Sequence, residues 1–203
     1  MPEANLNLSS VPIGMGRERT CYLHPDYPSR AVKVSGQEIG TQSKREIRFY
    51  RQIEKRNSFE FTHIPKFHGV VNTNLGKGIV VELIRDYNDS VSQSMLWYLD
   101  HGVSISTFEP LLASLKDYLL DNLVVINHDF VVGNLLLQKL SEQEARLVAI
   151  DGLGDVVTIQ WLNAIPAHVR CKINRRWDRF IRHLYTYPEV LQYLDPKQTR
   201  PEP

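Results

Sequence analysis

Cysteine is scarce in this sequence, and long apolar runs are absent from it. The two cysteines, Cys21 and Cys171, are far apart and lack metal-ligand spacing, so neither a disulfide framework nor a zinc site is expected. No run of about 18 apolar residues occurs, so no transmembrane helix is expected. Residues 1–10 lack a basic segment followed by an apolar one, which argues against a secretory signal. These absences together predict a cytoplasmic protein.

Charge of either sign is not in excess. The formal net charge is +1, which gives no whole-chain sign of binding to nucleic acid or to an acidic membrane. Hydrophobic residues make up 42% and charged residues 23%, which is typical of a water-soluble globular protein. A chain of 203 residues can bury a full core and is long enough for two small lobes.

The element pattern changes from strands to helices near residue 85. The elements expected in chain order are strand, turn and strand at 10–35, an amphipathic helix at 41–56, two strands at 66–84, helices at 94–100 and 108–122, a two-stranded unit, and a helix at 174–194. We therefore predict an α+β fold with a strand-rich lobe at 1–85 and a helical lobe at 86–203. A cleft between two lobes commonly binds a ligand.

The most informative stretch is 125–137. It holds Asp129 and Asn134 in an Asp-x4-Asn arrangement before an apolar run, and the next apolar run ends at Asp151. Kinase-like phosphotransferases place a general base and two Mg²⁺ ligands in this order. Asp129 would orient the proton of an attacking hydroxyl, while Asn134 and Asp151 would give Mg²⁺ the hard oxygens it requires. The alternative is a helix-capping Asp, a turn Asn and an Asp that ends a strand.

Two further features upstream favour phosphate chemistry. Lys33 on a predicted strand could reach nucleotide phosphates if a carboxylate held it, and Glu46 on the following helix is the candidate. The alternative is a solvent-facing lysine and a surface glutamate. Gly14 and Gly16 could let backbone N–H groups approach phosphate oxygens, although such a pair also occurs in plain hairpins.

Basic residues gather at two places. Arg17 and Arg19 directly follow the glycines and would either contact phosphates or stay solvated; we slightly favour solvation. Six basic residues between 170 and 182 indicate an amphipathic helix with a basic face in water. A surface for an anion, nucleic acid or lipid headgroup is the alternative. Nucleic acid is not expected as a partner, because no aromatic platform accompanies this cluster.

Several segments together indicate a family. Residues 14–25, 44–50, 64–69 and 115–122 and the Asn134 region resemble the YrbL proteins of Gram-negative bacteria, which are named for the PhoP regulatory network. The resemblance covers nearly the whole chain and implies the bilobal fold of the protein-kinase-like superfamily.

The resemblance also implies roles for single residues. It makes Lys33 the phosphate lysine, Glu46 its helix partner, Asp129 the catalytic base, and Asn134 and Asp151 the metal ligands. It further places Glu82 and Ile84 where the segment between the lobes would meet adenine.

The chain also departs from the kinase pattern. Arg19 replaces the third glycine of the phosphate loop, Asn127 replaces a histidine, Gly-Leu-Gly follows Asp151 and no Ala-Pro-Glu follows. We expect a kinase-like protein that binds ATP and Mg²⁺ between its lobes and, if it is active, transfers the γ-phosphoryl group to a hydroxyl. The acceptor, which could be a sugar, lipid, small metabolite or protein, is left open. The alternative is an inactive pseudokinase that serves as a regulatory module for a nucleotide or a partner.

Overall fold

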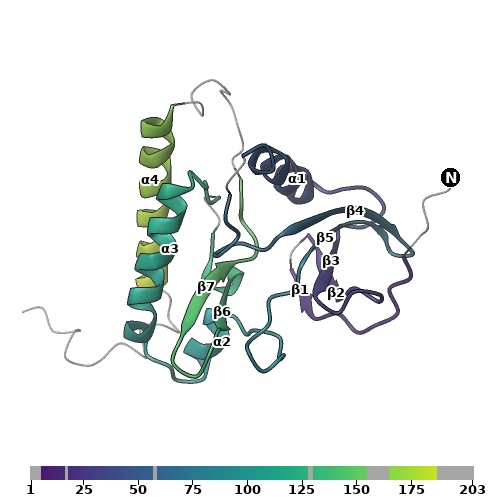
Figure 1. The fold of residues 1–203 in the computed structure, drawn as a ribbon, viewed down its shortest axis with the longest axis horizontal. Coiled ribbons are helices and arrows are strands. Elements are labelled where there is room, and N and C mark those ends of the chain that lie inside the picture. Colours follow the sequence, from purple (N-terminus) through teal and green to yellow (C-terminus); the bar gives the residue numbers. More distant parts are fainter. Residues whose placement is uncertain (1–5, 17, 57–58, 128–129, 155–164, 187–203) are drawn as a thin grey trace, which may run out of the picture. The chain divides into compact units, whose positions relative to one another are not determined.

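The computed structural model describes residues 6–16, 18–56, 59–127, 130–154 and 165–186. The chain forms two compact units, residues 1–85 (unit 1) and residues 86–203 (unit 2) (Figure 1). Within the described ranges, every helix is too short or too polar to span a lipid bilayer.

Unit 1 is built on an antiparallel sheet with the strand order β1-β2-β3-β5-β4 (Figure 1). The strands are β1 (Gly14–Met15), β2 (Thr20–Leu23), β3 (Arg30–Val34), β4 (Phe67–Thr73) and β5 (Gly76–Glu82). The central strand, β3, pairs with β2 on one side and with β5 on the other. Lys33 therefore lies between Cys21 and Ile79 on a strand that is buried from Ala31 onward.

The turn between β4 and β5 depends on one glycine. Gly76 has a φ of +119°, a region that L side chains rarely adopt. A Cβ atom built at Gly76 would also lie 2.0 Å from the carbonyl oxygen of Gly36. The close approach of these two loops therefore excludes any other residue at this position.

Helix α1 (Thr41–Ile53) packs beside β5 with one face buried. The buried face includes Ile47, Tyr50 and Ile53, whose i, i+3 and i+6 spacing explains why the predicted helix at 41–56 forms. The Tyr50 hydroxyl donates to the Pro65 carbonyl at 3.0 Å, and its ring stacks on Phe67 with centroids 4.9 Å apart. These contacts fix the rotation of α1 about its own axis and thus the direction of Glu46.

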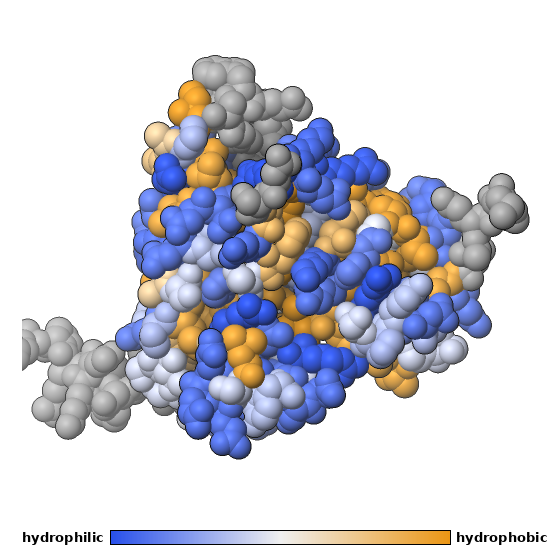
Figure 2. Space-filling model, in the orientation of Figure 1, coloured by the Kyte–Doolittle hydropathy of each residue, from blue (hydrophilic) through white to orange (hydrophobic). Residues whose placement is uncertain are grey.

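Unit 2 is mainly helical. Its elements are α2 (Met95–Asp100), η1 (Ile105–Phe108), α3 (Glu109–Asp121), η2 (Val132–Asn134), β6 (Leu135–Lys139), β7 (Ala145–Ala149) and α4 (Pro166–Thr186). Helix α3 packs against β7 and α4. Leu115 and Leu119 of α3, Leu147 of β7 and Ile173 of α4 are fully buried and form the centre of this core. Figure 2 shows apolar and hydrophilic residues interspersed on the visible face.

Helix α4 begins earlier than the sequence predicted. The prediction placed its start at Asn174, but the helix begins at Pro166, so that boundary is wrong. Proline suits the first turn of a helix because the backbone N–H it lacks has no intrahelical partner there. Val169 then continues the buried stripe by one turn ahead of Ile173. The predicted end at residue 194 lies outside the described residues. The α+β fold class itself is confirmed.

Candidate functional site

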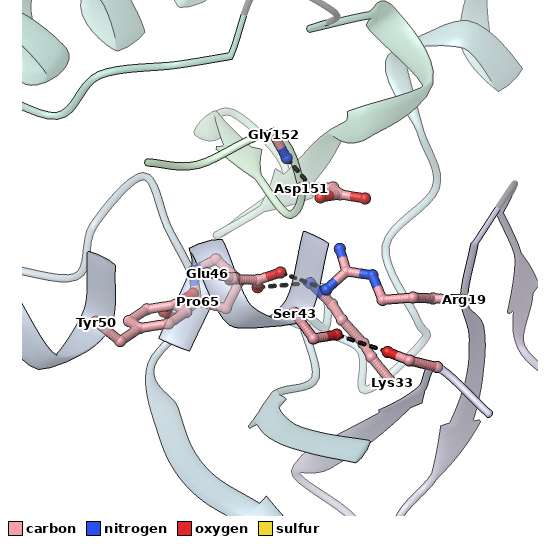
Figure 3. Close-up of polar contacts among 9 residues, drawn as sticks. Arg19, Lys33, Ser43, Glu46, Tyr50, Pro65, Asp151 and Gly152 are labelled. Atoms are coloured by element: carbon pink, nitrogen blue, oxygen red, sulfur yellow. Dashed lines mark hydrogen bonds and ion pairs between the residues drawn. The ribbon is translucent and has the colours of Figure 1, made fainter. Parts of the chain in front are cut away.

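A buried ion pair joins the central strand of unit 1 to its helix. Lys33 Nζ donates to Glu46 Oε1 at 2.9 Å, and the two side chains are 9% and 2% exposed (Figure 3). A hydrogen bond of 2.7 Å between the Ser35 and Ser43 hydroxyls also links the residue after β3 to α1. The interpretation of Lys33 and Glu46 as unrelated surface residues is therefore wrong, while their role toward a nucleotide stays a prediction.

The same carboxylate binds a second cation. Arg19 Nη1 donates to Glu46 Oε2 at 2.5 Å, and the Arg19 side chain is 6% exposed (Figure 3). The preference for a solvated Arg19 is therefore wrong. A basic residue in a polar turn is usually solvated, and nothing local in the sequence shows that this side chain folds inward over β3. Arg17 lies outside the described residues.

The Cys21 thiol lies beside these charges. Burial raises the pKa of the Cys21 thiol, and the nearby Lys33 and Arg19 oppose that rise only in part. A thiol that keeps its proton is a poor nucleophile. We therefore assign Cys21 a packing role next to the cluster.

Gly14 lies in β1, and Gly16 begins the turn between β1 and β2. Gly16 N–H donates to the Arg19 carbonyl at 2.8 Å and closes this turn. A Cβ at Gly14 would meet Cys21 Cβ at 3.9 Å, which is ordinary contact, and one at Gly16 would meet the Arg19 carbonyl oxygen at 3.4 Å. The fold itself therefore tolerates a methyl group at either position.

Glu82 and Ile84 lie at and just beyond the end of β5. Glu82 Oε2 accepts from Lys66 N–H at 3.0 Å, and Glu82 N–H donates to the Lys66 carbonyl at 2.8 Å. Ile84 is 5% exposed. Glu82 is thus tied to Lys66 within unit 1, and the proposed place of both residues beside adenine stays a prediction.

The register of β6 and β7 brings Asn134 and Asp151 to one end of a hairpin. Leu135 pairs with Ala149, and Ile150 N–H donates to the Asn134 carbonyl at 2.9 Å. One carboxylate oxygen of Asp151 accepts from Gly152 N–H at 2.6 Å, which fixes the side chain (Figure 3). An amide and a carboxylate oxygen at one hairpin end fit the donor chemistry of Mg²⁺. No group of three or more His, Cys, Asp or Glu side chains arranged to hold a metal ion occurs in the described part of the chain.

The segment before Asp129 is tied to the segment after Asp151. Asn127 N–H donates to the Gly152 carbonyl at 2.6 Å, and Ile126 forms an antiparallel bridge with Leu153. Gly152 has a φ of +74°, and a Cβ there would lie 3.0 Å from the Phe130 ring. The glycine after Asp151 is therefore required by the local backbone. Asp129 itself lies outside the described residues.

Two anchoring residues of unit 2 were missed by the sequence analysis. The buried Asp86 carboxylate accepts from the Ser92 hydroxyl at 2.5 Å and from Lys139 N–H at 3.0 Å, which ties the start of unit 2 to the end of β6. Arg176 Nη1 donates to the Ile126 carbonyl at 2.7 Å, so α4 braces the segment before Asp129. Asp86 lies in no recognisable motif, and Arg176 stood out only as one of the basic residues between 170 and 182, which were expected to face water.

His24 is a buried group whose ionisation bears on folding. Its Nδ1 accepts from Asp26 N–H at 3.2 Å and from Tyr27 N–H at 3.3 Å, which requires an unprotonated Nδ1. Burial lowers the pKa of His24, Asp26 opposes this and Arg30 adds to it.

A strand lysine held by a carboxylate of the following helix, within an antiparallel sheet, is the arrangement by which kinase-like proteins orient their phosphate lysine. The chain belongs to the YrbL family: residues 6–185 match the family model described as PhoP regulatory network protein YrbL. It is 28% identical over 195 residues to the YrbL proteins of Escherichia coli strain K12 and Shigella flexneri, covering 93% of this chain and 92% of each relative. The predicted family membership is confirmed.

Solved structures that resemble the chain include mutants of a kinase domain. A double mutant of the Mycobacterium tuberculosis PknI kinase domain superposes with a TM-score of 0.48 and 18% identity, covering 70% of this chain and 58% of that domain. A single mutant of the same domain gives a TM-score of 0.46 with 18% identity, 70% of this chain and 57% of the domain. The chain thus spans less than two thirds of the kinase domains it matches.

Proposed function

We propose that the protein binds ATP with Mg²⁺ and transfers the γ-phosphoryl group to a hydroxyl of an acceptor. The observation that carries this proposal is the Lys33–Glu46 pair, buried and 2.9 Å long on β3 and α1. A buried ion pair is seldom more stable than apolar residues of the same volume, so its presence favours a charged ligand over a purely structural role.

Each predicted residue has a separate task. Lys33 binds phosphate oxygens while Glu46 orients it, and the backbone at Gly14 and Gly16 approaches the phosphates. Asn134 and Asp151 hold Mg²⁺, which neutralises charge on the phosphates when bound. Positioning and electrostatic stabilisation supply most of the rate enhancement.

Three further assignments complete the proposal. Asp129 orients the acceptor hydroxyl and takes its proton. Glu82 and Ile84 contact adenine. We place the reaction in the cytoplasm, because both cysteines are free thiols, as expected in a reducing compartment.

Calorimetric titration of ATP with and without Mg²⁺ tests binding, and phosphate release or autophosphorylation with Mg²⁺ and Mn²⁺ tests transfer. Lys33→Ala should weaken ATP binding at least about tenfold, the worth of one charge-assisted hydrogen bond. Lys77→Ala is the matched control, because Lys77 lies on the neighbouring strand with its side chain 42% exposed in a surface pair with Glu38. Asp129→Ala and Asp151→Ala should abolish transfer. Full activity of Asp151→Ala contradicts the metal assignment.

A second candidate is a nucleotide-binding pseudokinase. It is favoured by the segment after Asp151, where Leu153 is 1% exposed and paired with Ile126 instead of being available as a mobile apolar switch. ATP binding without turnover in either metal supports this candidate. Measurable transfer that depends on Asp129 excludes it.

A further inference from the structure

Glu46 uses separate oxygens for its two cations. Oε1 binds the Lys33 ammonium and Oε2 binds the Arg19 guanidinium (Figure 3). The two cationic groups therefore lie next to each other, and a single carboxylate orients both. The side chain of Arg19 is as well buried as that of Lys33. Whatever Lys33 is oriented to bind, Arg19 is oriented toward the same region.

Arg19 also belongs to the loop predicted to cover phosphates. Its carbonyl accepts from Gly16 N–H and closes the turn between β1 and β2, while its side chain reaches Glu46 on α1. A guanidinium presents several donors in a rigid plane, so it can bind a carboxylate through one nitrogen and a phosphate through another. A loop that carries such a side chain recognises phosphate through a charge as well as through backbone N–H groups.

We infer that Arg19 is a second phosphate-recognition residue for a nucleoside di- or triphosphate, oriented by Glu46 in parallel with Lys33. This inference rests on the proposed nucleotide site and adds a basis for its selectivity: the site distinguishes nucleotides by their number of phosphates. Adenosine and AMP gain little from Arg19, whereas ADP and ATP gain a charge-assisted contact.

The rival explanation is a mechanical one. Arg19 ties the β1–β2 turn to α1, so its loss could loosen unit 1 without any contact to a ligand. Loosening of that kind lowers the affinity for ATP, ADP, AMP and adenosine by the same factor, because the binding of each requires the same folded unit. Loss of a phosphate contact lowers the affinity only for the ligands that carry the contacted phosphate.

The experiment is calorimetric titration of ATP, ADP, AMP and adenosine, at constant ionic strength with Mg²⁺, into wild type, Arg19→Met and Arg19→Lys. Arg48→Met is the control, because Arg48 is exposed on the same helix as Glu46 and its loss changes net charge equally. We expect Arg19→Met to lower the affinity for ATP about tenfold to hundredfold, which is the effect of losing one hydrogen bond to a charged group. The affinities for AMP and adenosine should be unchanged. The loss of ATP affinity in Arg19→Lys should be several-fold smaller than in Arg19→Met.

Other outcomes overturn the inference. Unchanged ATP affinity in Arg19→Met excludes a phosphate contact, and an equal loss for ATP and adenosine shows a mechanical role. Circular dichroism checks that each variant folds; if Arg19→Met does not, Arg19→Lys must still weaken ATP relative to AMP. Failure of wild type to bind any nucleotide is a separate result, because it removes the proposed function and the inference with it.

Discussion

Replacing Glu46 by glutamine removes the anion shared by two buried cations. The substitution keeps the size of the side chain, which is 2% exposed, and deletes the charge that binds Arg19 and Lys33. Removing one partner of a buried ion pair typically costs about 3–5 kcal/mol. Because two cations lose the same anion, we expect a loss of about 5 kcal/mol in the free energy of unfolding unit 1.

Removing one of the two cations should cost less stability than removing the anion. Lys33→Met leaves Glu46 bound to Arg19, and Arg19→Met leaves it bound to Lys33, so each should cost about 1.5–3 kcal/mol. The double variant removes both of these cations from a buried carboxylate. It should therefore cost about 1–2 kcal/mol more than the sum of the single variants.

The assay must distinguish the units. The three tryptophans, at 97, 161 and 177, all belong to residues 86–203, so their fluorescence reports unfolding of unit 2. Amide hydrogen exchange of α1 and β3 reports opening of unit 1. Each variant should lower the protection of α1 and β3, and the tryptophan signal shows whether unit 2 is affected as well.

Two results would refute this reasoning. One is a loss below about 1 kcal/mol in Glu46→Gln, since that is the range of a single neutral hydrogen bond. The other is a double variant whose loss equals the sum of its parts, because a shared carboxylate cannot give additive costs.

Three further predictions concern other residues. Alanine at Gly14 or Gly16 should change the unfolding free energy by no more than about 1 kcal/mol in urea melts but weaken ATP binding about tenfold; unchanged affinity excludes the phosphate-loop role. Because the pKa of His24 is below its usual 6.5, protonation opposes folding, and stability should fall as pH decreases through the window below 6.5. His24→Gln should flatten that slope between about pH 7 and pH 5, and an unchanged slope contradicts the assignment. Asp86→Ala should cost about 3 kcal/mol in unit 2 by tryptophan fluorescence, since two bonds to a buried carboxylate are lost; a loss under about 1 kcal/mol would show that they matter little.

Local patterns predicted what depends on local spacing. The helix at 41–56 follows from apolar residues that recur on one face, and the hairpin that aligns Asn134 with Asp151 follows from two apolar runs separated by a turn. The Lys33–Glu46 contact was suggested by the order of residue types, and β3 and α1 realise it through their packing.

Contacts that depend on tertiary folding could not be predicted in this way. Arg19 occupies a position where most arginines are solvated, and only the closure of the β1–β2 turn directs it toward Glu46. The bond from Arg176 to the Ile126 carbonyl spans fifty positions and needs both segments in place. The start of α4 was missed because a helix boundary is set by backbone hydrogen bonds as well as by the apolar stripe.

An apolar replacement of the cluster of Arg19, Lys33 and Glu46 can distinguish a role in stability from a role in ligand binding, because burying charge is costly. Replacing a buried ionic triad by apolar residues of similar volume is often neutral or stabilising by about 1–4 kcal/mol. A triple variant with methionine at 19 and 33 and leucine at 46 should therefore fold at least as stably as Glu46→Gln, by exchange protection of α1, while binding no ATP by calorimetry. A triple variant that folds and still binds ATP with wild-type affinity would show that the charges serve neither purpose. If instead it fails to fold where Glu46→Gln does, the cluster is a structural element, and the proposal of a phosphate site loses its main support.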